Sequence, residues 1–449
     1  MSLSEAAAVL QARSSGSDAR FSGVSTDSRT LRPGELFVAL RGERFDGHAF
    51  LKQATAARAA AALVDRNYAG EYPLPVVIVE DTRLALGELA RHWRARFSPV
   101  LVAVAGSNGK TTVKEMLASI LRAHAGDAAV LATAGNLNND IGVPLTLLRM
   151  RHAHRWCAIE LGMNHKGEIG YLARIARPTV ALVNNAQREH LEFMGSVEEV
   201  AAENAAVYEA LPEDGVAIVN ADDAHAAFFR ARAGRRRVVD FGIDKPAAVS
   251  GSYELKPLAS ELAIRTPAGG AAATLAIPGL HNVRNALAAA ACGFAARIAP
   301  ATIAAGLSAF RPYGGRLQVK RSRDGATLID DSYNANPDSV RAAIDVLASC
   351  PGPTVLVLGD MGEMGAQGED FHREVGAYAR AKGVSSLLAL GDSTRHAVKA
   401  FGAGARHFEK LEDLIPNVSG KSILVKGSRF MKMERVVSAL TGAPAQGGH

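Results

Sequence analysis

The chain has 449 residues, a length that suits about three domains of ordinary size. Hydrophobic residues make up 48% and charged residues 21%, which is typical of a globular protein with buried cores. The net charge of +6 is compatible with small anionic substrates but too diffuse to indicate nucleic acid binding. The three cysteines lack CxxC or CxxH spacing, so the sequence suggests neither a zinc site nor a disulfide framework. Because it shows no N-terminal signal and no run of apolar residues long enough to span a bilayer, we expect a cytoplasmic protein without membrane insertion.

Residues 1–82 are expected to form a small α/β domain. Short apolar runs at 36–40 and 76–79 predict strands, and the alanine-rich stretch 50–62 predicts a helix. An amphipathic stretch over 83–98, which a proline follows, predicts a helix that connects this domain to the next.

Residues 99–313 show a regular alternation of strand-like and helix-like segments. Such alternation predicts a parallel sheet covered on both faces. The strand-like runs lie at 100–104, 156–161, 179–183 and 216–219. A less regular β-rich stretch near 251–279 and an alanine-rich helix over 282–297 follow.

The alternation restarts in residues 314–449, which predicts a second, Rossmann-like α/β domain. Its predicted strands lie at 327–329, 354–358, 387–390 and 423–425. Three of them end in polar or glycine-rich turns, and open α/β sheets bind ligands at the carboxyl ends of their strands. The sequence therefore predicts an α/β protein of three domains, in which the last can close over the central one.

The segment Gly106-Ser107-Asn108-Gly109-Lys110-Thr111-Thr112 lies between a predicted strand and a predicted helix. This arrangement is typical of loops that bind the phosphates of a nucleoside triphosphate. The glycines let backbone N–H groups approach the phosphates, Lys110 offers a charge and Thr111 offers a hydroxyl to Mg²⁺. Val104 replaces the glycine that usually begins the pattern, so this loop is a shortened variant. The alternative interpretation is a tight turn with an incidental lysine.

Two residues at the ends of predicted strands are candidate metal ligands. Glu160 ends one strand, and in P-loop enzymes an acidic residue at a neighbouring strand end holds Mg²⁺ directly or through water. A surface carboxylate that caps the next turn is the alternative. His190 follows another strand, where a metal or substrate ligand and an ordinary histidine are equally compatible with the sequence.

Two pairs of asparagines are candidate ligand contacts. Asn138 and Asn139 lie in a polar loop that could bind a phosphate or amide group or could cap a helix. Asn282 and Asn285 share one face of a helix and carry both donors and acceptors, as an adenine edge requires. Capping of the helix by Asn282 is the alternative.

A predicted hinge and a polar strand end complete the candidate site. Arg316 follows two glycines at the hinge and can reach a γ-phosphate when the domains close. The polar segment 330–337 ends a strand, and its composition suits recognition of a ribose, Mg²⁺ or an amine.

Taken together, these residues make the chain resemble the Mur ligases, the ATP-dependent amide-forming enzymes of peptidoglycan synthesis, over nearly its whole length. The segment Gly106 to Thr112 and several later positions match the family's ATP and Mg²⁺ sites. These later positions are Glu160, His190, Asn282, Asn285, Arg316 and Asp331. Motifs of the first domain match the family's domain for the UDP-sugar end of the substrate. Their candidate contacts are Ser28, Arg29, Asp46 and His48.

Further motifs are similar to those of the family member that adds D-alanyl-D-alanine to UDP-N-acetylmuramoyl-tripeptide. They contain the candidate substrate contacts Asn334, Asn336, Lys426 and Ser428. Asn138 and Asn139 of the polar loop are further candidate substrate contacts. The resemblance implies ATP and Mg²⁺ as cofactors, an acyl-phosphate intermediate, and D-alanyl-D-alanine binding by the C-terminal domain. It implies catalytic roles for Lys110, His190 and Arg316, and metal contacts from Thr111, Glu160 and His190. No feature argues against a monomer, and the residues leave open whether the third peptide residue is diaminopimelate or lysine.

Two rival functions remain at this point: a Mur-type ligase with a different amino acceptor, and a P-loop switch or motor that binds ATP to regulate a partner. The second leaves the motifs at 27–29 and 330–337 without a purpose. One departure concerns Asn204, which stands where the family usually has a lysine whose carbamate lies near Mg²⁺. We expect that no carbamate forms here and that Glu203 or a water substitutes.

Overall fold

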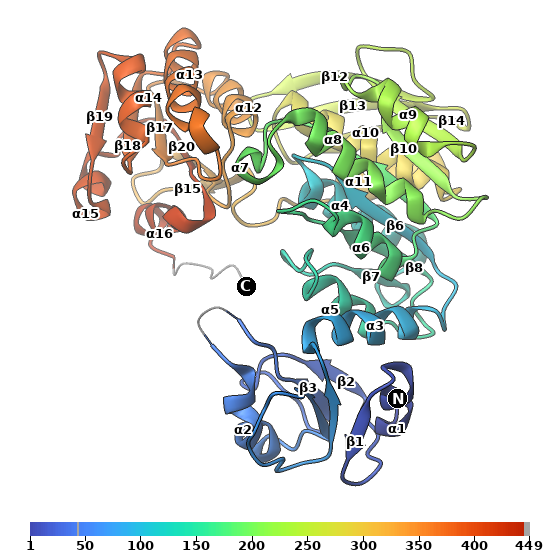
Figure 1. The fold of residues 1–449 in the computed structure, drawn as a ribbon. Coiled ribbons are helices and arrows are strands. Elements are labelled where there is room, and N and C mark those ends of the chain that lie inside the picture. The colour runs from blue at the N-terminus through green and yellow to red at the C-terminus, as the bar shows by residue number, and fades with distance from the viewer. Residues whose placement is uncertain (43–44, 444–449) are drawn as a thin grey trace.

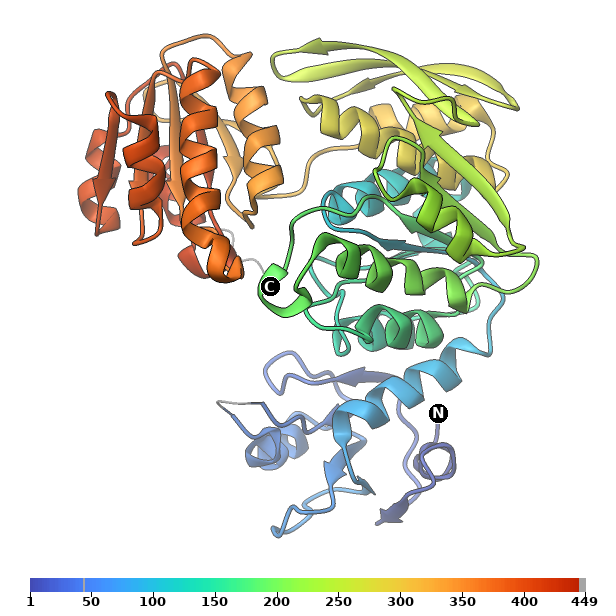
Figure 2. The same ribbon diagram turned by 45° about the horizontal axis from the view of Figure 1, so that its top comes forward.

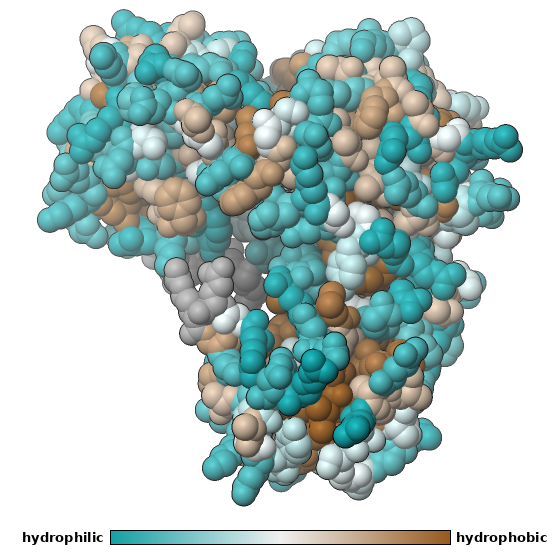
Figure 3. Space-filling model, in the orientation of Figure 1, coloured by the Kyte–Doolittle hydropathy of each residue, from teal (hydrophilic) through white to brown (hydrophobic). Residues whose placement is uncertain are grey.

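The computed structural model describes residues 1–42 and 45–443. Within that part, the strands form three sheets of five, nine and six strands, which follow one another along the chain. Each sheet with its helices forms one module, and Figures 1 and 2 show the C-terminal module beside the central one and the N-terminal module below it. Polar residues cover most of the face in Figure 3, and apolar ones gather where the N-terminal and central modules meet.

The N-terminal module contains a sheet in the order β1-β5-β4-β3-β2. Its elements are α1 (Leu3–Val9), β1 (Arg13–Ser15), β2 (Gly23–Ser25), β3 (Glu35–Val38), α2 (Leu51–Ala56), β4 (Ala61–Asp65) and β5 (Val76–Val79). The helix predicted over 50–62 is wrong in its second half, because α2 ends at Ala56 and β4 begins at Ala61. Alanine favours helices, but here Ala61 and Ala62 are fully buried in a strand paired on both sides.

Helix α3 (Thr82–Arg94) occupies the place of the predicted connector. It begins at Asp81, whose carboxylate accepts hydrogen bonds from the backbone N–H groups of Arg83 and Leu84. Its apolar residues Leu86 and Leu89 are fully buried and belong to one hydrophobic cluster with side chains of the first and second modules. The helix therefore joins the two modules by packing as well as by chain connection.

The central sheet has the order β14-β13-β12-β11-β10-β9-β6-β8-β7, parallel from β12 to β7 and antiparallel from β12 to β14. Its strands are β6 (Val100–Ala105), β7 (Val130–Ala132), β8 (Trp156–Glu160), β9 (Val180–Val183), β10 (Val216–Asn220), β11 (Arg237–Gly242), β12 (Val249–Lys256), β13 (Ala259–Thr266) and β14 (Gly269–Leu275). Its helices are α4 (Lys110–Ala125), α5 (Gly142–Leu148), α6 (Glu168–Ala176), α7 (Leu191–Met194), α8 (Val197–Ala205), α9 (Ala226–Ala233), α10 (Leu280–Ala295) and α11 (Pro300–Ala309).

Alternate residues of β6 face opposite sides of this sheet, as the two-residue period of a strand requires. Val102 and Val104 pack into the cluster that contains α4, α10 and α11, whereas Leu101 and Ala103 pack toward α3, α5 and α6. Both faces of β6 are therefore buried, which confirms the predicted covered parallel sheet.

The C-terminal sheet has the order β15-β16-β20-β17-β18-β19, parallel except for the edge strand β15. Its strands are β15 (Gln318–Arg321), β16 (Thr327–Asp331), β17 (Thr354–Gly359), β18 (Ser386–Leu390), β19 (Ala405–Phe408) and β20 (Ser422–Lys426). Its helices are α12 (Pro337–Ala348), α13 (Gly368–Ala381), α14 (Thr394–Phe401), α15 (Leu411–Leu414) and α16 (Glu434–Thr441). In the described part of the chain, no helix combines the length and apolar character needed to cross a membrane.

Candidate active site

The glycine-rich loop runs from the end of β6 to the start of α4. Gly106 has φ +123°, and a Cβ atom there would lie 2.9 Å from the backbone nitrogen of Asn184, so only glycine fits. The Asn204 Oδ1 atom accepts a hydrogen bond from the Gly106 N–H at 2.7 Å, and Asn185 Oδ1 accepts one from Asn108 N–H at 2.8 Å. Side chains that follow β9 and end α8 thus hold the loop in shape.

The Lys110 side chain is turned onto its own loop. Its Nζ atom donates to the carbonyls of Gly106 at 2.5 Å and Ser107 at 2.9 Å. It also lies 3.2 Å from Glu189 Oε1. Burial raises the pKa of Glu189 above its usual value, although Lys110 opposes this. The lysine is thus already held at the mouth of the loop, where a phosphate would lie.

Thr111 and Glu160 form an oxygen-lined position suited to Mg²⁺. Thr111 Oγ1 lies 3.1 Å from Glu160 Oε1, and Asn138 Nδ2 donates to the same oxygen at 2.8 Å. The second carboxylate oxygen, Glu160 Oε2, is buried and makes no hydrogen bond in the described structure. Hard cations such as Mg²⁺ prefer oxygen ligands and retain waters and phosphate oxygens, so these residues fit the ion. The described residues hold no cluster of three or more His, Cys, Asp or Glu suited to a metal.

His190 lies at the start of α7 with φ +52°, a left-handed conformation that is uncommon for a residue other than glycine. Such backbone conformations persist where the surrounding structure requires them, often at functional sites. Its Nδ1 atom lies against the carboxylate of Glu363 from the C-terminal module. His190 also lines the same cavity as Lys110, so the structure brings these two predicted catalytic residues together.

A cavity of about 280 Å³ contains these residues, and we call it the phosphate cavity. The central module contributes Lys110, Thr111, Asn138, Asn139, Glu160 and His190. The C-terminal module contributes Arg316, Asn334, Asn336 and Lys426. The predicted convergence of Lys110 with Arg316 is therefore present in this structure.

A second cavity of about 400 Å³ adjoins the first, and we call it the nucleoside cavity. Asn282, Asn285 and Asp331 line it, and it shares Asn108, Gly109, Arg316 and Lys426 with the phosphate cavity. Asn282 does not cap α10, which begins after Gly279; its Nδ2 atom donates to the carbonyl of Pro278. Asn285 instead accepts a hydrogen bond from Asn184 at 2.9 Å, which ties α10 to the glycine-rich loop.

A buried ion pair supports the wall between these cavities. Lys426 Nζ lies 2.5 Å from Asp331 Oδ2 and donates to the carbonyl of Asn334 at 3.0 Å. Ser428 is also buried, and its hydroxyl donates to the carbonyl of Ala335. The charge of Lys426 is therefore neutralised within the protein, and Ser428 holds a loop; both support the wall, a role the sequence did not predict.

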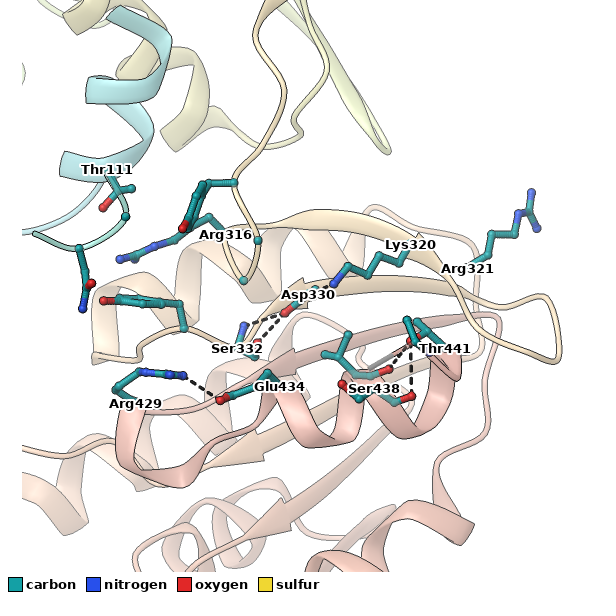
Figure 4. A pocket seen from close by; sticks show the side chains of 18 residues that line it. Thr111, Arg316, Lys320, Arg321, Asp330, Ser332, Arg429, Glu434, Ser438 and Thr441 are labelled. Atoms are coloured by element: carbon teal, nitrogen blue, oxygen red, sulfur yellow. Dashed lines mark hydrogen bonds and ion pairs between the residues drawn. The ribbon is translucent and has the colours of Figure 1, made fainter. Parts of the chain in front are cut away.

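The largest of these cavities, about 560 Å³, lies on the C-terminal module and opens toward Thr111 (Figure 4). In that view Arg316 extends toward Thr111, and its guanidinium lies 4.2 Å from the centre of the Tyr333 ring. Lys320 pairs with Asp330 at 2.7 Å farther along the wall. We call this space the third cavity; it shares Thr111, Arg316 and Tyr333 with the phosphate cavity.

The predicted UDP-sugar contacts lie in the N-terminal module and line none of these three cavities. Arg29 pairs with Asp27 at 2.6 Å, and the Ser28 hydroxyl donates to Gln53 at 3.1 Å. His48 remains a predicted contact, but its ring is held within the module. It is buried, its Nδ1 lies 2.5 Å from Asp46, and its Nε2 accepts the Asp65 N–H, so both ring nitrogens are used within the module.

The structure also corrects the expectation for Glu203. Both of its carboxylate oxygens accept backbone N–H groups, from Gly167 and Ile169 at 2.8 Å, so it caps α6 and does not line the phosphate cavity. Sequence reasoning missed Glu189 and Asn185 as supports of the loop. The available signal was their position just after β9, at the carboxyl end of a strand next to β6.

Three family profiles match successive parts of the chain: "Mur ligase family, catalytic domain" over residues 20–94, "Mur ligase middle domain" over 104–293, and "Mur ligase, glutamate ligase domain" over 315–429. A UDP-N-acetylmuramoyl-tripeptide–D-alanyl-D-alanine ligase of Escherichia coli is 43% identical over 98% of both chains. The ligase of that name from Haemophilus influenzae is 38% identical over the same shares.

Solved structures agree with these sequence matches. A crystal structure of MurF from Acinetobacter baumannii superposes with a TM-score of 0.91, at 34% identity over 98% of both chains. MurF ligase from Thermotoga maritima, solved in complex with ADP, gives a TM-score of 0.81 at 25% identity, over 95% of this chain and 98% of that one. Similarity of this extent in sequence and fold, together with the convergent loop, carboxylate and arginine, shows that the chain belongs to the Mur ligase family.

Proposed function

We propose that this chain joins D-alanyl-D-alanine to UDP-N-acetylmuramoyl-tripeptide with hydrolysis of ATP, as an acid–amino-acid ligase of peptidoglycan synthesis. Its full-length relatives from Escherichia coli and Haemophilus influenzae carry that name. The observation that carries the chemistry is the phosphate cavity, where Lys110 and Glu160 of one module face Arg316 of another.

ATP occupies the two adjoining cavities in this proposal. The adenosine lies in the nucleoside cavity near Asn282 and Asp331, and the phosphates extend past Asn108 and Gly109, which line both cavities. Backbone N–H groups at the start of α4 and the helix dipole favour the phosphates. The ADP complex of the Thermotoga maritima relative supports the binding of an adenine nucleotide.

In the first step, the terminal carboxylate of the tripeptide attacks the γ-phosphate, and ADP leaves as an acyl phosphate forms. Lys110 and Arg316 stabilise the charge of the transferring phosphoryl group and hold it in line with the carboxylate. Thr111, Glu160 and His190 would hold Mg²⁺, which supplies charge neutralisation for the phosphates.

In the second step, the amine of D-alanyl-D-alanine attacks the acyl carbon and phosphate leaves. We assign the dipeptide to the third cavity, because that space meets the phosphate cavity at Arg316 and Tyr333. Its cations Lys320 and Arg429 are paired with acidic partners, so they offer a polar rather than a strongly cationic wall. Phosphorylation is required because a free carboxylate has no good leaving group for the amine to displace.

We further propose a monomeric, cytoplasmic enzyme in which no carbamate forms, because Asn204 has no amine and its Oδ1 atom holds Gly106 N–H. Since Glu203 caps α6, a water takes the place that the carbamate has in other family members. Assays with bicarbonate removed test this point. The proposal of a monomer is tested by sedimentation.

The function is tested by phosphate release from ATP with the three substrates and with each omitted in turn. We expect release to require UDP-N-acetylmuramoyl-tripeptide, and the pentapeptide product to appear only with D-alanyl-D-alanine. Product formation with meso-diaminopimelate in place of the dipeptide would assign another acceptor. Nucleotide hydrolysis that ignores the UDP-linked peptide would contradict the ligase function altogether.

A further inference from the structure

Arg188 makes several charge-assisted hydrogen bonds between the central and C-terminal modules. Its Nη2 atom donates to Asp338 Oδ1 at 2.6 Å, and its Nη1 atom donates to Glu374 Oε2 at 2.7 Å. Its backbone N–H also donates to Asp338 Oδ2 at 3.1 Å. Asp338 lies in α12 and Glu374 in α13, so one arginine of the central module contacts two helices of the other. We call Arg188, Asp338 and Glu374 the interdomain clamp.

The surroundings of Arg188 make this contact stronger than an ordinary surface ion pair. The arginine and Asp338 side chains are each only 23% exposed, and the Phe371 ring centre lies 5.1 Å from the guanidinium. Hydrogen bonds to Asp338 and then Glu374 raise the pKa of Arg188, and the arginine in turn lowers the pKa of Glu374. Charge-assisted bonds from a planar guanidinium fix direction as well as distance, so they constrain the backbone that carries it.

The residues next to Arg188 belong to the phosphate cavity or support its loop. Gln187 accepts a hydrogen bond from Asn108 Nδ2 at 2.7 Å, and its backbone N–H donates to Ser107 Oγ at 2.9 Å. Glu189 holds Lys110, and His190 lines the cavity. Residues 187–190 are therefore fixed on one side by the glycine-rich loop and on the other by the clamp.

Figures 1 and 2 both show the segment of α7 at the boundary between the two modules. The green segment that carries α7 reaches away from the central module and lies beside the orange helices of the C-terminal one. Two further contacts cross the same boundary: Asn336 Nδ2 donates to Asn108 Oδ1 at 2.9 Å, and His190 Nδ1 lies against Glu363. The loop that contacts the glycine-rich segment is thus placed by the C-terminal module as well as by its own sheet.

From this geometry we propose that Arg188 is a positioning residue, through which docking of the C-terminal module sets the placement of Glu189 and His190 in the phosphate cavity. This proposal rests on the proposed function. When the modules separate, Arg188 loses both carboxylates, and residues 187–190 lose the constraint that orients them toward Lys110. Arg188 thereby couples docking to catalytic geometry without touching the substrates, beside the direct His190–Glu363 contact.

Arg341 supplies a matched control. It pairs with the same Glu374 at 3.0 Å and lies 4.5 Å from the centre of the Tyr378 ring, but all these groups belong to the C-terminal module. Arg188→Ala and Arg341→Ala therefore remove similar contacts, one across the module boundary and one within a module. Arg188→Lys keeps the positive charge but loses the planar guanidinium that binds Asp338 and Glu374 at once. It replaces the alanine variant in the test if that variant does not fold.

The test measures kcat and the KM for ATP, with thermal unfolding and small-angle scattering of each variant. For Arg188→Ala we expect kcat to fall about 10- to 100-fold, because the catalytic groups would be misplaced. The KM for ATP should change less than about threefold. Arg188→Lys should lie between this variant and wild type, and Arg341→Ala should keep its kcat. Among these variants, we expect a larger radius of gyration for Arg188→Ala only. The substitution Glu374→Gln should lower kcat when it is made in the wild-type protein but not when it is added to Arg188→Ala.

An unchanged kcat in Arg188→Ala, or equal losses in Arg188→Ala and Arg341→Ala, would overturn the proposal. So would a loss of kcat without any change in scattering. If wild type itself forms no product with D-alanyl-D-alanine, the proposed function fails, whereas the scattering comparison still reports whether the clamp holds the modules together.

Discussion

Replacement of Lys110 by alanine tests the glycine-rich loop most directly. The Lys110 ammonium is the charge at the loop mouth, held 2.5 Å from the Gly106 carbonyl and 3.2 Å from Glu189. Loss of one preorganised charge from a phosphoryl-transfer site costs about 3–4 kcal/mol of transition-state stabilisation, or about 10²- to 10³-fold in kcat. Because backbone N–H groups at the start of α4 would also bind the phosphates, we expect the affinity for ATP to fall much less than kcat.

The same replacement affects stability through a different residue. Without Lys110, the Glu189 carboxylate remains buried with no cation beside it, and an unpaired buried charged group destabilises a protein by about 1–3 kcal/mol or more. The double variant Lys110→Ala, Glu189→Gln removes that charge. We therefore expect it to regain most of the lost stability but none of the lost turnover.

Phosphate release with all three substrates and thermal unfolding of the single and double variants measure these effects. Near-normal ligation by Lys110→Ala would remove the loop from the mechanism. Recovery of turnover in the double variant would show that the single variant failed only because Glu189 was left unpaired, and this would equally refute the catalytic role of the lysine.

Other predictions concern polar groups around the cavities. Burial lowers the pKa of His281 from 6.5 to about 4, so below pH 6.5 the unfolded chain binds a proton that the folded chain excludes. We therefore expect the free energy of unfolding to fall between pH 6.5 and 4. Chemical denaturation of His281→Gln should lack this part of the fall. Asn204→Ala removes the acceptor for Gly106 N–H and should destabilise the loop by about 1–3 kcal/mol, measured by local hydrogen exchange, while wild-type turnover stays the same without bicarbonate. Lys426→Met leaves Asp331 buried without its cation and should cost about 3–5 kcal/mol in unfolding, with a weaker affinity for ATP in binding assays.

Local patterns sufficed wherever one segment carried its own signal. The run of β-branched and apolar residues before Gly106 could be placed as a buried strand, and the glycines and Lys110 as a phosphate loop, because their backbone requirements are local. The helix expected over 50–62 failed for the opposite reason. The choice between helix and strand at Ala61 depends on pairing with β3 and β5, which come from other parts of the chain.

Some roles of polar side chains could likewise be predicted from the sequence, and others could not. Glu160 and Arg316 could be selected from their positions after a strand and a hinge, and the structure places both in the phosphate cavity. His48 and Glu203 looked equally suitable, but their ring nitrogens or carboxylate oxygens are consumed by neighbours inside the protein. A sequence shows that a side chain can form hydrogen bonds, but it does not show which group the fold places within hydrogen-bond distance of it.

The sequence by itself determined the three α/β modules and the nucleotide loop, because hydrophobic periodicity and glycine geometry act over short stretches of chain. Only the tertiary structure decided that Arg316 and Lys110 line one cavity, and that Asn204 and Glu189 support the loop. It also decided that Arg188 contacts two helices, through residues 150 and 186 positions away along the chain. Those pairings depend on how sheets from separate modules are oriented, and a charge or amide gains its role from the partner that this orientation brings within hydrogen-bond distance.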